Sequence, residues 1–86
     1  MNTSAEKLVG ELLRKFTGRL EGDYLREYSA LVEAGEWGVA FENLCVQLYE
    51  FEVHVDESEY EQIETAGSLM GLDASCWSFL KQDTSY

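Results

Sequence analysis

The sequence predicts an all-α fold, a compact antiparallel bundle of four to five short helices that forms one domain over residues 1–86. Three observations support this prediction. The chain contains no proline, the residue that most strongly interrupts helices. Its apolar side chains recur at intervals of three and four residues, which places them on one face of a helix. A hydrophobic fraction of 45% is sufficient for one modest core in a chain of this length.

The first helix is expected over residues 3–20. Thr3 and Glu6 have the spacing of a capping box, in which each side chain accepts a hydrogen bond from the backbone N–H of the other residue. Gly18 or Gly22 is expected to end the helix, because glycine readily adopts the left-handed conformation found there. The side chains that recur at helical spacing are Leu8, Leu12, Leu13 and Phe16.

A second helix is expected over residues 23–34, with Asp23 as its N-cap and Gly35 directly after its end. The third helix, over residues 36–52, has the strongest periodicity in the chain and is expected to lie at the centre of the core. Residues 51–55 alternate between apolar and polar side chains, as a short strand does. Since no second strand is available for pairing, we interpret them as the frayed helix end and an extended connector.

The fourth helix is expected over residues 57–70. Asp56 and Glu59 form a second capping-box pattern, and Gly71 is expected to end the helix. A short helix after Asp73 completes the fold. Aromatic residues at helical spacing are assigned to the core; they are Trp37, Phe41, Trp77 and Phe79.

The charge of the chain is strongly acidic and unevenly distributed. Seventeen acids against six bases give a formal net charge of −11 at pH 7. Residues 1–32 contain equal numbers of acids and bases, so the excess lies in residues 33–86, where Lys81 is the only base. Free nucleic acids and anionic membranes are polyanions, so this charge argues against both as partners and favours a basic protein. Solubility alone is the alternative explanation.

The sequence contains no pattern typical of a catalytic, cofactor or metal site. His54 is the only histidine, and Cys45 and Cys76 are not part of a CxxC pair. The segment from Asp56 fails as a calcium loop, because Glu61 stands where that loop requires glycine. We therefore expect a protein that is not an enzyme and binds no cofactor or metal.

The beginning of the chain has no apolar segment of the kind found in secretory signals. No apolar run approaches the roughly 18–20 residues that a membrane helix requires. We therefore expect a cytoplasmic protein whose two cysteines are reduced.

Three segments carry a resemblance to a known family. They are A-G-E-W-G-V-A-F-E-N-L-C-V-Q-L-Y-E-F from Ala34, E-Y-E-Q-I from Glu59, and M-G-L-D-A-S-C-W-S-F-L from Met70. This pattern, over about residues 31–80, is similar to that of the small MafI-type immunity proteins of bacterial toxin–immunity systems. Related proteins accompany toxins of contact-dependent growth inhibition. The resemblance implies a helical protein that binds and neutralises the C-terminal domain of a cognate toxin, commonly a nuclease that acts on RNA such as tRNA.

The densest acidic stretch, residues 50–64, is the expected contact surface for a basic toxin domain, with Tyr49 as an aromatic anchor. The alternative is a solvated helix face without a partner. The candidate partner-binding residues are Tyr49, Glu50, Glu52, Asp56, Glu57, Glu61 and Glu64.

Two other functions are compatible with the same acidity. One is a nucleic-acid mimic that inhibits a DNA-binding protein, which would require carboxylates spaced like the phosphates of a duplex. The other is an adaptor subunit that leaves the activity of its partner unchanged.

Overall fold

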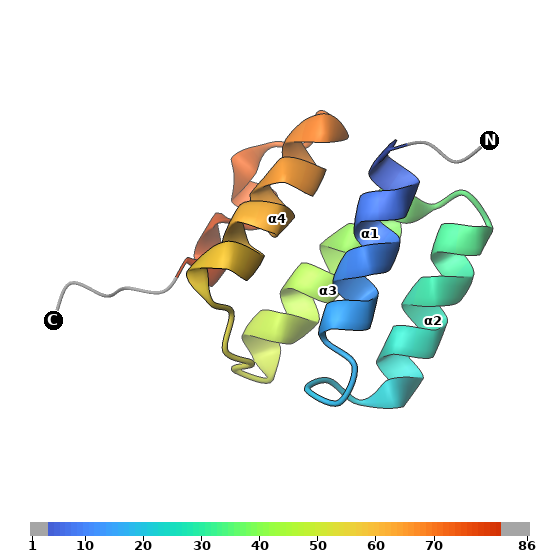
Figure 1. Ribbon diagram of the computed structural model, residues 1–86, viewed down its shortest axis with the longest axis horizontal. Coiled ribbons are helices and arrows are strands. Elements are labelled where there is room, and N and C mark those ends of the chain that lie inside the picture. Colours follow the sequence, from blue (N-terminus) through green and yellow to red (C-terminus); the bar gives the residue numbers. More distant parts are fainter. Residues whose placement is uncertain (1–3, 82–86) are drawn as a thin grey trace, which may run out of the picture.

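The computed structural model describes residues 4–81, and this part of the chain is an all-helical bundle without strands. Figure 1 shows α1 and α2 side by side and running in opposite directions, with α4 on the other side of α1. The third helix, α3, packs against both α1 and α2. The elements are α1 (Ser4–Lys15), α2 (Gly22–Glu33), α3 (Trp37–Glu50), α4 (Glu57–Leu69) and the short 3-10 helices η1 (Ala74–Cys76) and η2 (Ser78–Leu80).

The prediction of an all-α bundle is confirmed, and one hydrophobic core joins its elements. Every α-helix contributes at least one fully or nearly fully buried side chain, as expected from the apolar stripes of the sequence. The largest fully buried side chains are Phe16, Phe41, Leu12, Leu44, Leu48, Ile63, Val9, Val55 and Cys45.

The first two helices differ from their expected bounds. α1 ends at Lys15, because the chain then turns through Gly18, which has a φ of 87°. Both Phe16 and Leu20, on either side of this turn, are buried in the core. The N-cap of α2 is Glu21 and makes no side-chain capping bond, so the prediction of Asp23 as N-cap is wrong. The predicted Thr3 cap lies outside the described residues.

The third helix begins after Gly35, which adopts the expected left-handed conformation with a φ of 87°. It ends at Glu50, two residues before the expected end, because Glu52 also has a positive φ, of 51°. Residues 53–56 form an irregular connector that buries Val55 against the core. The interpretation of this segment as a connector is confirmed.

The capping box of α4 is confirmed in both directions. The Asp56 carboxylate accepts from the backbone N–H of Glu59 at 2.8 Å, and the Glu59 carboxylate accepts from the N–H of Asp56 at 3.1 Å.

Gly67 in the same helix lies against the buried ring of Trp77, which follows η1. The core assignment of Phe79 needs correction, since this side chain is exposed, whereas Trp37 is half-buried and packs against the core.

Candidate partner-binding surface

An acidic groove runs along the exposed side of α4. We call it the α4 groove; it has a volume of about 550 Å³ and is lined by His54, Val55, Asp56, Glu57, Tyr60, Glu61, Glu64 and Lys81. Glu57, Glu61 and Glu64 are spaced at i, i+4 and i+7, so they lie on one face of the helix. All three are exposed. The helix therefore presents a row of carboxylates to any molecule that enters the groove.

A second groove, of about 360 Å³, lies between the end of α3 and η2. The rings of Tyr49 and Phe79 meet in it edge to face, with centroids 5.4 Å apart and an interplanar angle of 79°. Their exposed fractions are 59% and 39%. We call it the aromatic groove; its lining is Leu48, Tyr49, Glu52, Val53, His54, Phe79, Leu80 and Lys81.

The two grooves form one continuous surface, because His54 and Lys81 line both of them. Among the residues that line this surface, five are acids and Lys81 is the one lysine or arginine. Six of the seven candidate residues contribute to it. The exception is Glu50, which lines neither groove although its side chain is exposed.

Glu52, which lines the aromatic groove, has a strained backbone conformation with a positive φ of 51°. It follows α3 in the left-handed region, where its N–H binds the carbonyl of Tyr49 and the N–H of Val53 binds the carbonyl of Leu48. This is the Schellman arrangement, in which glycine is preferred because a Cβ is disfavoured at positive φ. Residues in sparsely populated conformations cluster at functional sites, so this outlier supports a role for Glu52.

The acids at the beginning of α4 differ in whether their carboxylates can contact a partner. The Asp56 carboxylate is exposed but already accepts the capping hydrogen bond of the helix. Glu59 is buried and forms an ion pair with Arg19. Burial raises the pKa of Glu59, but hydrogen bonds from Arg19 and from the Asp56 N–H outweigh it, so the pKa lies below its ordinary value. Glu59 is therefore a structural residue, whereas Glu57 is free to contact a partner.

The acidic surroundings also affect Tyr60, which is half-buried in the α4 groove. Burial raises the pKa of its phenol, and the nearby Glu64 carboxylate raises it further, because both disfavour a phenolate. The ring therefore stays neutral at physiological pH and offers a hydroxyl among the carboxylates.

Phe79, His54 and Lys81 also line this surface, although the sequence did not indicate them as contact residues. The sequence assigned Phe79 to the core with Trp77, but the chain on either side of Trp77 forms the 3-10 helices η1 and η2, which have three residues per turn. That spacing directs Trp77 and Leu80 inward together and leaves Phe79 outside. Recognising the 3-10 geometry in the sequence would have indicated its exposure.

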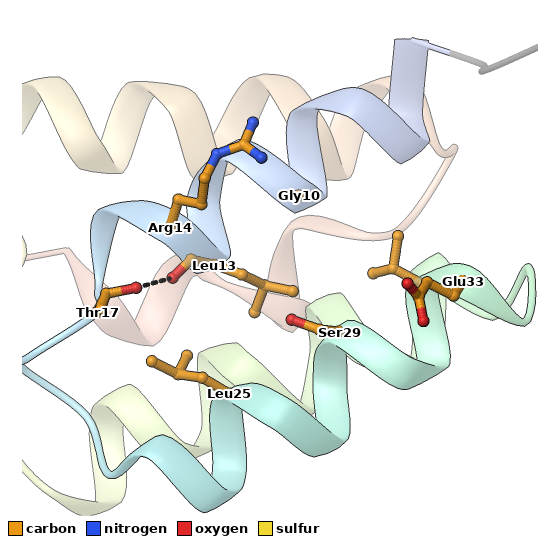
Figure 2. A pocket seen from close by; sticks show the side chains of 8 residues that line it. Gly10, Leu13, Arg14, Thr17, Leu25, Ser29 and Glu33 are labelled. Atoms are coloured by element: carbon orange, nitrogen blue, oxygen red, sulfur yellow. Dashed lines mark hydrogen bonds between the residues drawn. The ribbon is translucent and has the colours of Figure 1, made fainter.

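A separate pocket of about 240 Å³ lies between α1 and α2 (Figure 2). Arg14 and Ser29 line it from the two helices, and the Thr17 hydroxyl donates to the Leu13 carbonyl at 3.4 Å. Arg14 and Glu33 give this pocket charges of both signs. None of the candidate residues lies here, so it is not part of the acidic surface.

No group of three or more metal-binding side chains occurs among residues 4–81. None of the helices in this part of the chain has the length and apolar character needed to cross a bilayer. Comparison of the chain with protein-family models, with curated proteins and with solved structures gave no match.

Proposed function

We propose that this protein is a cytoplasmic immunity protein that binds a cognate toxin domain, of the nuclease class, and neutralises it without catalysing a reaction. The observation that carries the proposal is one continuous surface with five carboxylates and two exposed aromatic rings. The resemblance of residues 31–80 to MafI-type immunity proteins directs it to a toxin rather than to another basic partner.

The chemistry of the surface fits such a partner. A nuclease needs a basic cleft to hold the phosphates of its substrate, and a row of carboxylates complements that cleft. Opposite charges accelerate association, which benefits an inhibitor that must bind incoming toxin before it acts. Aromatic side chains are frequent centres of binding energy in protein interfaces. In this proposal the carboxylates occupy the cleft and exclude the nucleic acid.

The test is capture of the partner by the tagged protein from a lysate of its source bacterium, with mass spectrometry and a salt titration. We expect one stoichiometric partner, a basic domain whose nuclease activity is lost in the complex. Affinity should fall as salt rises. Recovery of several unrelated DNA-binding proteins would favour the mimic, and a partner with unchanged activity would favour the adaptor; either outcome contradicts the proposal.

Two variants with equal net charge make the test specific to the α4 groove. Replacement of Glu57, Glu61 and Glu64 by glutamine removes three carboxylates from it. Replacement of three exposed acids of the α1–α2 region, Glu11, Glu21 and Glu27, removes the same charge elsewhere. The first variant should bind at least about a hundredfold more weakly, at about 1 kcal/mol or more per carboxylate. The second should bind nearly as the parent does, and equal losses would show that net charge alone matters.

A further inference from the structure

We infer that the Tyr49–Phe79 pair is the docking point for one apolar side chain of the partner, flanked by lysine or arginine side chains that reach Glu52 and the α4 carboxylates. The inference deepens the proposed function and rests on it, because it takes the partner to be a basic protein. It adds a recognition pattern for the partner: an apolar residue between basic ones.

The exposure of the aromatic pair supports an apolar contact. The two rings pack against each other edge to face, but 59% of Tyr49 and 39% of Phe79 remain accessible to solvent. Val46 lies one turn before Tyr49 on α3 and is 44% exposed, which extends the apolar area along the helix. An apolar side chain placed against the pair would remove surface of both rings from water.

The charges around the pair select the occupant. Glu52 lines the same groove, and the carboxylates of Glu57, Glu61 and Glu64 follow beyond His54 and Lys81. Bases of single-stranded nucleic acids also stack on exposed aromatic rings. Here the neighbouring carboxylates would repel the phosphates of such a strand. A basic peptide segment with an apolar residue can place that residue against the rings and its lysine or arginine side chains against the carboxylates.

A second copy of the chain is a poorer occupant. Its acidic half would repel this surface, and residues 1–32 carry no net charge. Two of the five bases in that half, Arg19 and Arg26, already pair with Glu59 and Asp23. Among residues 4–32, Lys7, Arg14 and Lys15 are then the three further bases for head-to-tail association with a surface that has five carboxylates.

The experiment is an NMR titration of the full chain, labelled with ¹⁵N, with two short peptides. Both carry the same number of lysines, and they differ only at the centre, which is leucine in one and serine in the other. We expect the leucine peptide to bind about tenfold more tightly, as burial of one aliphatic side chain predicts. Its shifts should include the amides of Val46, Tyr49 and Phe79. Equal affinities of the two peptides would overturn the inference.

Matched variants show which residues cause the preference for the leucine peptide. Tyr49→Ser and Phe79→Ser should each reduce the ratio of the two affinities towards one. Phe51→Ser is the control, because Phe51 is 52% exposed, contacts Tyr24 and lines neither groove; it should keep the ratio. A ratio that persists in the Tyr49→Ser/Phe79→Ser double variant would also overturn the inference. Thermal melts confirm that each variant is folded.

Failure of this inference and failure of the proposed function are distinguishable. Capture of a toxin whose affinity is unchanged by Tyr49→Ser and Phe79→Ser would retain the function and reject the docking point. A leucine preference at the aromatic pair, with no inhibited toxin among the captured proteins, would retain the docking point and reject the immunity function.

Discussion

The side chains of Arg19 and Glu59, which are 40 residues apart in the chain, form an ion pair between the turn after α1 and the first turn of α4. Arg19 Nη1 lies 3.3 Å from Glu59 Oε1, and its guanidinium lies 4.6 Å from the centroid of the Phe16 ring. The pair therefore holds the beginning of α4 against α1. Together with the core contacts of Ile63 and Ala66, it positions the helix that carries Glu57, Glu61 and Glu64.

Loss of this pair should destabilise the fold. Glu59→Gln removes the charge that Arg19 binds and weakens the capping box, so the free energy of unfolding should fall by about 2 kcal/mol. Urea denaturation measures the change. Glu61→Gln, an exposed position on the same helix, should change it by less than about 0.5 kcal/mol. Similar losses in both variants would contradict the structural role of Glu59.

The same pair should make stability depend on pH. The pKa of Glu59 is lowered in the folded state from its ordinary value of 4.5. The unfolded chain therefore binds this proton more readily, and the stabilisation from the pair is complete above about pH 4.5. It is lost as the pH falls through the lower pKa of the folded state. The difference in unfolding free energy between the parent and Glu59→Gln should shrink as the pH falls below about 4.5. A constant difference would contradict this.

Gly67 should not tolerate a side chain. A Cβ at this position would overlap Cζ3 and Cε3 of Trp77, which is buried and has little room to move. Gly67→Ala should lower the free energy of unfolding by about 2 kcal/mol or more. Gly10→Ala is the matched control in α1, where a Cβ meets nothing within 4 Å. It should raise stability by up to about 1 kcal/mol, the difference in helix propensity. Thermal melts of both variants test the prediction.

Glu52 should show opposite effects on stability and binding. Glu52→Gly relieves the positive φ of 51° and should stabilise the fold by about 1 kcal/mol. The same change removes a carboxylate from the aromatic groove, so affinity for a basic partner should fall. Glu50→Gly at the last residue of α3 is the control, because it lines neither groove and lies in a helix, where glycine should destabilise. Melting and isothermal titration calorimetry measure the two effects separately.

Asp56 and Glu57 are adjacent acids with different expected roles. Asp56→Ala removes the N-cap of α4 and should cost about 1 kcal/mol of stability. Glu57→Ala should leave stability within about 0.5 kcal/mol and weaken partner binding instead. Urea denaturation and a binding titration of both variants test this. If both variants lost only stability, or both lost only affinity, the capping hydrogen bond would not distinguish the roles of Asp56 and Glu57.

Part of the candidate surface could be predicted from the sequence alone. The i, i+4, i+7 spacing of Glu57, Glu61 and Glu64 places their side chains together once α4 is recognised, because this relation is local. Phe79 and Lys81 could not be assigned to the same surface, since they come from a segment that packs against α3 and α4 through non-local contacts. Glu50, the last residue of α3, is exposed but lines neither groove, which the sequence could not indicate.

The sequence by itself determined the all-α class, the capping box of Asp56 and Glu59, the left-handed Gly35 and the concentration of acid after residue 33. These features depend on side chains within a few residues of one another. The tertiary structure decided the early end of α1, the pairing of Arg19 with Glu59, the exposure of Phe79 and the joining of the two grooves. Each of these depends on which distant segments pack together, and local spacing carries no information about that choice.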